Sequence, residues 1–210
     1  PMYVNSPFGI SLAHNGNLLN APELLESFVQ TDSRHINTDS DSELLLNVLA
    51  DELQKGDREK QPAEQIFSAV RALHGRVKGA YAVVALITGF GIVGFRDPNG
   101  IRPLIYGKRR KGGAEEFMIA SESVALSVLG FQPVSDVMPG EAVFIDTKGN
   151  VSVKQCFDQP RYTPCIFEYV YLARPDSVID KVSVYKARLK MGEKLADKIF
   201  REYPDNDIDV

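Results

Sequence analysis

Residues Ile10-Ser11-Leu12-Ala13-His14-Asn15-Gly16-Asn17-Leu18 are the stretch on which the interpretation of this chain depends. The alternation from Ile10 to Ala13 predicts a half-buried strand. The Asn15-Gly16 pair tolerates positive φ, so we expect a sharp turn there. Such a turn could aim the Asn15 amide and the Gly16 N–H at one point, as the two donors of an oxyanion hole. An ordinary hairpin or strand-to-helix turn is the alternative that the local sequence leaves open.

Helices and then strands are expected after this stretch. The first helix follows an N-cap at Asn20, the second starts at a Ser40-x-x-Glu43 capping box, and the third runs over 62–75. A shorter helix is expected over 121–129. Strands are predicted over 80–87, 91–95, 104–108, 117–120, 142–146 and 151–154. Short turns between neighbouring strands favour antiparallel pairing, so the fold class is α+β.

The composition describes a globular protein and excludes several classes of function. The chain has 210 residues, 44% of them hydrophobic, and a net charge of -4, so no electrostatic case for nucleic-acid binding exists. The one basic cluster, at 108–111, is read as a solvated hairpin tip. No apolar run is long enough to span a membrane and no signal segment opens the sequence, so we expect a cytoplasmic location. Cys156 and Cys165 lack metal-type spacing, and no metal site is expected.

The composition changes near residue 158. A polar connector with two prolines over 158–164 is typical of a domain boundary, so we expect one domain over 1–158 and another over 159–210. A strand over 166–172, a helix over 181–203 and a new strand from 206 would open an α/β unit. Both chain ends interrupt expected strands, which suggests a segment of a longer protein.

Few residues carry recognisable chemistry. Asp41 stands in the first turn of a helix, where the dipole favours a carboxylate, but it could instead hold a ligand's ammonium group. The turn at 96–103 is explained by a wide hairpin stapled through arginine contacts, and 121–123 by helix capping. The histidines at 14, 35 and 74 are too scattered to indicate a metal site or a Ser-His pair. These residues supply no nucleophile.

Six phrases of the sequence together resemble the amidophosphoribosyltransferase family of class II glutamine amidotransferases. They run in order through the chain, and those containing Gly-Ile-Arg-Pro-Leu and Arg-Pro-Asp-Ser are specific to this family. The phrases lie at 11–18, 35–43, 77–81, 95–104, 120–123 and 167–177.

The resemblance implies a fold and a set of site residues. It implies a partial αββα sandwich of the N-terminal-nucleophile hydrolase type, followed by the start of an α/β phosphoribosyltransferase domain. In this family an N-terminal cysteine attacks glutamine and its α-amino group acts as base. Residue 1 here is proline, so the nucleophile is absent from this chain, which alone is expected to be inactive. The resemblance makes Asn15 and Gly16 oxyanion donors and Asp41 the ligand of the glutamine amino group, with His14 a further substrate-binding candidate.

The resemblance also implies the reaction and the partners. Glutamine and phosphoribosyl diphosphate would give phosphoribosylamine, the first committed step of purine synthesis, with Mg²⁺ bound outside this chain. Tyr169 and Tyr171 would lie where the domains meet and ammonia passes. Cys165 matches one ligand of the iron–sulfur cluster that some relatives carry, but no cluster is expected. A homo-oligomer, dimer or tetramer, with feedback by purine nucleotides is expected. Another class II amidotransferase, or a non-catalytic glutamine-binding module, remain the alternatives.

Overall fold

The computed structural model describes residues 1–28, 36–57, 59–205 and 207. Its helices are α1 (Ala21–Ser27), α2 (Asp41–Lys55), α3 (Pro62–Arg76), α4 (Ser123–Val128), α5 (Val184–Glu202) and the π-helical turn η2 (Glu168–Leu172). Its strands are β1 (Met2–Val4), β2 (Ile10–Leu18), β3 (Gly79–Ile87), β4 (Gly91–Arg96), β5 (Ile105–Lys111), β6 (Ala114–Ala120), β7 (Gln132–Asp136), β8 (Glu141–Asp146), β9 (Val151–Gln155), β10 (Val178–Ile179) and β11 (Val182–Ser183).

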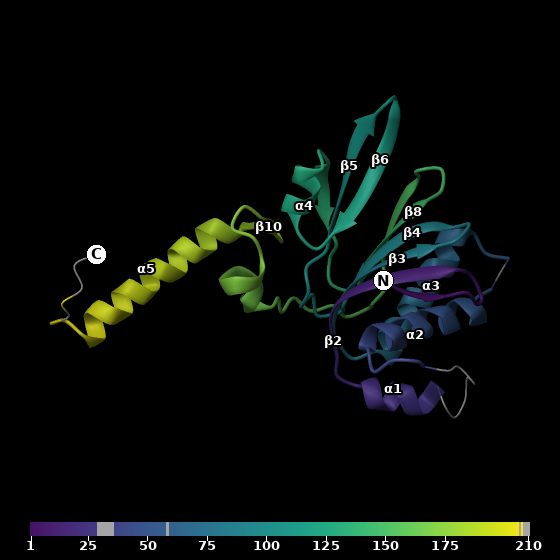
Figure 1. Ribbon diagram of the computed structural model, residues 1–210, viewed down its shortest axis with the longest axis horizontal. Coiled ribbons are helices and arrows are strands. Elements are labelled where there is room, and N and C mark those ends of the chain that lie inside the picture. The colour runs from purple at the N-terminus through teal and green to yellow at the C-terminus, as the bar shows by residue number, and fades with distance from the viewer. Residues whose placement is uncertain (29–35, 58, 206, 208–210) are drawn as a thin grey trace.

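The body of the protein is built of four layers (Figure 1). An antiparallel sheet in the order β1-β2-β3-β4-β8-β9 packs one face on α2 and α3. A three-stranded sheet in the order β6-β5-β7 covers its other face, through a second apolar cluster. Helix α4 packs on the outer side of that smaller sheet. The layers are therefore helix, sheet, sheet and helix, which confirms the expected partial αββα sandwich.

Strand β3 lies at the centre of the larger sheet and, apart from exposed Leu86, is covered on both faces. Tyr81, Val83 and Ala85 belong to the cluster under the helices, whereas Ala82 belongs to the cluster between the sheets. Because both faces are covered, the strand has a nearly continuous apolar sequence instead of an alternating one.

The sharp turn expected at Asn15-Gly16 is wrong. Strand β2 continues to Leu18, with Asn15 opposite Ala82 and Gly16 opposite Tyr81 in β3. Gly16 has φ 147°, and a Cβ there would collide with the carbonyl oxygen of Ala80. The glycine thus permits close approach of two strands within a continuous ladder.

Most other expected elements are confirmed. Helices α2, α3 and α5 lie close to their expected ranges, and Ser40 caps α2 by accepting the N–H of Ser42. Asn20 does not cap α1 with its side chain, which instead bonds the backbone of Arg76 and Lys78. Strand β7 was not expected, because most of its residues are exposed and it lacks an apolar alternation.

The segment 96–103 does not close a hairpin, because β4 and β5 belong to different sheets. The Asp97 carboxylate accepts the backbone N–H groups of Asn99, Ile101 and Arg102, which folds the segment back on itself. The expected arginine contacts are present: Arg96 donates to the carbonyl oxygens of Gly100, Arg102 and Val137. The segment is a crossing between sheets, stapled by Arg96.

Arg96 also holds the second part of the chain. Its two terminal nitrogens lie 2.7 and 2.8 Å from the two carboxylate oxygens of Asp180, in the turn between β10 and β11. The Arg96 side chain is 1% exposed and that of Asp180 9%. Asp180 adopts the uncommon left-handed conformation, with φ 48°. A bidentate, buried ion pair thus joins β4 to the β10–β11 turn.

The connector to residues 159–210 is attached to the body by backbone hydrogen bonds. The N–H groups of Arg161, Thr163 and Cys165 donate to the carbonyl oxygens of Pro98, Asn99 and Ile101, respectively. Helix capping does not explain Glu122 and Ser123, because their side chains accept bonds from the 174–178 segment. Side chains at the start of α4 thus anchor the 174–178 segment to the body of the protein.

The strand expected over 166–172 is wrong. Residues 168–172 form η2, in which Glu168 and Tyr169 are buried while Tyr171 is exposed. No strand of the described residues pairs with this segment, so its aromatic, β-favouring composition has no ladder to join. Helix α5 is confirmed, whereas the strand expected from 206 falls almost entirely outside the described residues.

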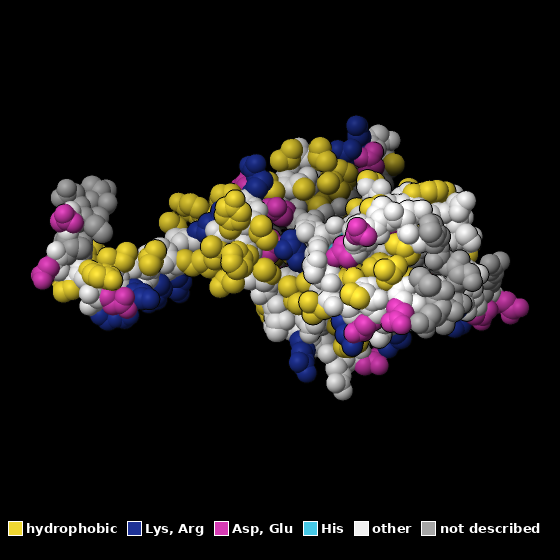
Figure 2. Space-filling view, turned by 60° about the horizontal axis from the view of Figure 1, so that its bottom comes forward, with side chains coloured by type: hydrophobic (Ala, Val, Ile, Leu, Met, Phe, Trp, Pro, Cys, Tyr) yellow, Lys and Arg dark blue, Asp and Glu magenta, His cyan; other side chains and the backbone are white. Residues whose placement is uncertain are grey.

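Helix α5 extends away from the body (Figure 1) and is supported only at its start. A small cluster of Tyr169, Ala173, Ile179 and Val184 holds it. Figure 2 shows hydrophobic side chains gathered over the region where this helix leaves the body. Among the described residues, no helix combines the length and hydropathy needed to cross a membrane.

Replacement of Gly16 by alanine should destabilise the protein severely, because the new Cβ meets the Ala80 carbonyl and the backbone is at positive φ. We expect a loss of at least about 2 kcal/mol in the free energy of unfolding, measured by urea denaturation. Gly75→Ala is the control, since nothing lies within 4 Å of a Cβ built there and the residue is inside α3. That variant should be as stable as the parent or more so, and equal behaviour of both variants would contradict the close-approach argument.

Replacement of Asp180 by asparagine should separate the second part of the chain from the body. Asparagine tolerates the left-handed conformation, so the change isolates the loss of charge opposite buried Arg96. We expect a loss of about 3 kcal/mol in unfolding free energy. Asp176→Asn removes one partner of an exposed pair with Arg174 and should leave the thermal midpoint nearly unchanged. Equal midpoints for the two variants would show that the buried pair does not stabilise the fold.

Candidate functional site

The last residues of β2 form an open sheet edge. Strand β1 pairs only with Ile10–Leu12, so beyond Leu12 no described strand lies on that side. The Leu19 N–H donates to the backbone carbonyl oxygen of Lys78, on the side of β3. The Leu18 N–H points to the opposite side and donates to a carboxylate oxygen of Asp41, 3.0 Å away. Since backbone directions alternate along a strand, the Gly16 N–H points to the same open edge as that of Leu18. Gly16 thus presents a donor outside the sheet.

Asp41 lies beside this edge at the first position of α2. Its second carboxylate oxygen is 3.7 Å from Nδ1 of His14, and the same nitrogen is 3.2 Å from the Ser42 hydroxyl. The exposed N–H groups at the start of a helix favour a carboxylate there. The structure therefore brings His14, Gly16 and Asp41 together.

His14 is held in its neutral form at this site. Burial lowers the pKa of its imidazole, and the nearby Asp41 charge opposes that effect only in part. A neutral ring beside Asp41 leaves the carboxylate free to pair with a cation other than imidazolium.

The Asn15 side chain contacts a different set of residues. Its carbonyl oxygen accepts a hydrogen bond of 2.9 Å from Arg102, and its amide nitrogen lies 3.4 Å from the Ser121 hydroxyl. Because a guanidinium can only donate, the atom facing Arg102 must be the amide oxygen. The amide NH₂ of Asn15 is therefore directed away from Arg102 and retains an N–H for a ligand.

Sequence reasoning missed three residues around Asn15. The turn over 96–103 and the cap at 121–123 give Arg102 and Ser121 no role at the site, and no role is expected for Glu168, yet the Arg102 guanidinium lies 2.9 Å from both Asn15 and Glu168. The signal available was the position of these residues inside three of the resembling phrases. Their contacts could not be read from spacing, since 66 residues separate Arg102 from Glu168.

The two tyrosines proposed for an ammonia route differ in their surroundings. Tyr169 is buried and its hydroxyl donates to the carbonyl oxygen of Ile179, 3.2 Å away, whereas Tyr171 is 78% exposed. In the described part of the chain, neither tyrosine bonds Asn15 or Asp41. His35 lies outside the described residues.

Neither cysteine is suited to act as the nucleophile. Burial raises the pKa of the Cys156 thiol to about 11, so it stays protonated near neutral pH. Cys165 belongs to the connector, where its N–H bonds Ile101. Within the described ranges, no group of three or more His, Cys, Asp or Glu side chains could hold a metal ion.

Comparison with known proteins decides the family. Residues 1–128 match the model of the "glutamine amidotransferase domain". The chain belongs to this glutamine amidotransferase family. The chain is 60% identical over 210 residues to an amidophosphoribosyltransferase of Pseudomonas aeruginosa and 56% identical over 211 residues to that of Escherichia coli, both times over 100% of this chain. It spans 42% of the length of each of these relatives.

A solved structure shares the fold of this chain. The glutamine phosphoribosylpyrophosphate amidotransferase of B. subtilis, complexed with ADP and GMP, superposes with a TM-score of 0.75 at 31% identity. The match covers 93% of this chain and 40% of that chain. The N-terminal-nucleophile hydrolase architecture is thereby confirmed for the layers described above.

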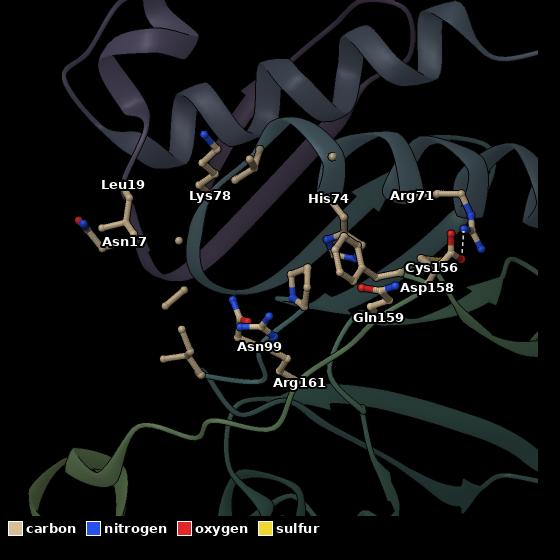
Figure 3. A pocket seen from close by; sticks show the side chains of 17 residues that line it. Asn17, Leu19, Arg71, His74, Lys78, Asn99, Cys156, Asp158, Gln159 and Arg161 are labelled. Atoms are coloured by element: carbon tan, nitrogen blue, oxygen red, sulfur yellow. Dashed lines mark hydrogen bonds and ion pairs between the residues drawn. The ribbon is translucent and has the colours of Figure 1, made fainter.

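A pocket of about 970 Å³ lies beside the end of strand β2 (Figure 3). It is lined by Asn17, the end of α3, the start of β3, the 98–101 turn and the connector. Lys78 and Arg161 give it positive charge, whereas Arg71 is paired with Asp158. His74 closes one side, with Nδ1 2.8 Å from the Tyr81 hydroxyl. No sequence pattern predicted this pocket, because its walls come together only in the fold.

Acidification should destabilise the protein through His74. Burial lowers the pKa of this imidazole from 6.5 to about 4, so between these values the unfolded chain binds more protons than the folded one. Stability from this group is therefore full above pH 6.5 and is lost as the pH falls toward 4, by on the order of 3 kcal/mol. Urea denaturation between pH 7 and 4 should show a shallower pH dependence for His74→Gln than for the parent. Identical slopes would contradict a depressed histidine pKa.

Proposed function

We propose that this chain is the glutaminase part of an amidophosphoribosyltransferase. That enzyme makes phosphoribosylamine, glutamate and diphosphate from glutamine and phosphoribosyl diphosphate. The identity to relatives of that name supports the proposal over the whole length of the chain. The observation that carries it is the open edge of β2, where the outward-facing Gly16 N–H and the Asn15 amide are on the strand and the Asp41 carboxylate reaches the same edge from α2.

The geometry supports recognition of glutamine at both of its ends. Asn15 and Gly16 would donate to the side-chain carbonyl oxygen as it gains negative charge during attack. Asp41 would accept the α-ammonium group. The side chain that faces its carboxylate is the His14 imidazole, which burial favours in the neutral form, and within the described ranges no lysine or arginine pairs with it. The attacking thiolate would come from the N-terminal cysteine implied by the family resemblance, a residue that is not part of this chain.

The remaining assignments are proposed with the function. We assign 1–158 to the glutaminase domain and 159–210 to the start of a phosphoribosyltransferase domain. Ammonia would pass near η2, with exposed Tyr171 better placed to line a passage than Tyr169, whose hydroxyl is engaged. Purine nucleotides would act as regulators, as the ADP and GMP of the B. subtilis structure suggest, in a cytoplasmic homo-oligomer.

Magnesium would act with phosphoribosyl diphosphate in a part of the enzyme outside this chain, as the family resemblance implies.

Replacement of Asn15 by alanine in the full-length enzyme tests the proposal. It removes one oxyanion donor, so the glutamine-dependent rate should fall by the equivalent of about 3 kcal/mol while the rate with free ammonia is spared. Steady-state kinetics with each nitrogen source measure the two rates.

Asn17→Ala is the matched control, because Asn17 lies on the same strand and bonds only its neighbour's carbonyl oxygen. Both of its rates should stay within about twofold of the parent. Equal loss of the two activities in Asn15→Ala would contradict the oxyanion role.

A further inference from the structure

Arg102 connects the oxyanion strand to the second part of the chain. One terminal nitrogen of its guanidinium, Nη2, lies 2.9 Å from the side-chain amide oxygen of Asn15, Oδ1, and 2.9 Å from Oε1 of Glu168. The backbone N–H of Arg102 is fixed by the Asp97 carboxylate at 3.1 Å. The Arg102 side chain therefore extends from a fixed turn and contacts both β2 and η2.

The contact with Arg102 determines which way the Asn15 amide faces. A primary amide has an acceptor and a donor end of nearly equal shape, and only the donor end stabilises an oxyanion. With a guanidinium on one side, the amide oxygen is drawn to it and the NH₂ is turned away. Without that cation the amide could turn over, and its oxygen would repel the developing negative charge.

Glu168 holds Arg102 in this position. The Glu168 side chain is 6% exposed, and that of Arg102 is 15% exposed, so the pair is shielded from water. Burial raises the pKa of Glu168, Arg102 and Arg96 oppose this rise, and the Glu122 carboxylate adds to it. The Oε1 contact is an ion pair without hydrogen-bond alignment, and Nε of Arg102 has no hydrogen-bond partner among the described residues. A small displacement of Glu168 would therefore change how Arg102 is shared.

The position of Glu168 depends on the second part of the chain. Its N–H bonds the carbonyl oxygen of Cys165 in the connector, and its own carbonyl oxygen accepts the N–H of Ala173. Arg188 of α5 donates to the carbonyl oxygens of Tyr169 and Ala173, 2.7 Å from each. Movement of α5 is thus transmitted to η2, which carries Glu168.

We propose that Arg102 and Glu168 are positioning residues that couple the 159–210 segment to the oxyanion donor Asn15, so that glutamine hydrolysis responds to the state of that segment. This inference rests on the proposed function. The bistable element is the Asn15 amide, whose productive orientation is favoured when Glu168 and Arg102 are in contact.

A double-mutant cycle in the full-length enzyme tests this coupling. Arg102→Met and Glu168→Gln are each made in the parent and in Asn15→Ala, and rates are measured with glutamine and with ammonia. In the parent, each should lower kcat with glutamine by about tenfold while KM for glutamine and the ammonia rate change less than about twofold, because the donor acts in the transition state. In Asn15→Ala each should cause less than about a twofold further loss, since the group they position is gone.

Two controls match the chemistry of these changes. Arg109→Met and Glu115→Gln remove partners of surface ion pairs in the β5–β6 hairpin, and should leave both rates near those of the parent. Thermal midpoints establish that each variant is folded. If Arg102→Met does not fold, the nearly isosteric Glu168→Gln still gives a complete cycle.

The outcomes separate this inference from the proposed function. Selective loss in Asn15→Ala, together with losses in Arg102→Met and Glu168→Gln that multiply with it, would overturn the coupling and leave the oxyanion role intact. Parallel loss of the ammonia rate in both new variants would show a general structural role and would overturn it as well. Loss of both activities in Asn15→Ala would overturn the proposed function and the coupling together.

Discussion

The buried ion pair between Arg96 and Asp180 is the interaction on which the arrangement of this protein depends. It joins the end of a central strand to the β10–β11 turn, and both charges are removed from water. Such a pair is favourable only when its remaining donors are satisfied, and here the other guanidinium N–H groups bond two carbonyl oxygens of the crossing segment and that of Val137, which follows β7. Asp97, the next residue, folds that segment through backbone bonds. One short segment therefore shapes the crossing between the sheets and anchors the chain that follows.

The candidate site is a consequence of where β2 ends its pairing. On one side β3 takes up the backbone groups of β2, and on the other the pairing with β1 stops at Leu12, so no described strand takes up the outward-facing donors beyond it. Gly16 lets β2 and β3 approach closely where a side chain would collide with Ala80. The start of α2 brings Asp41 to the free edge. The site thus combines an open edge of a sheet with a helix N-terminus, both fixed by a packed core.

The same crossing segment unites the proposed catalytic and regulatory features. Arg96 anchors the β10–β11 turn, and Arg102, six residues later, contacts both Asn15 and Glu168. The chain after residue 159 is thus joined to the donor strand by charged contacts, whereas its larger apolar side chains on α5 remain exposed. Electrostatic contacts of this kind depend steeply on geometry, which suits a connection that transmits small movements.

The sequence by itself determined the alternation of helices and strands, the antiparallel pairing and the α+β class, because periodicity and turn residues reflect local preferences. The sandwich class came from the family resemblance of the sequence. The sequence also singled out Asn15, Gly16 and Asp41, although it misread a continuous strand as a turn, since Asn-Gly suits both a turn and a close strand approach. Only the tertiary structure decided that 166–172 is helical, because a strand needs a partner that the sequence does not specify. It alone showed that Arg102 lies between Asn15 and Glu168, because contacts between distant residues arise from packing, which has no local signature.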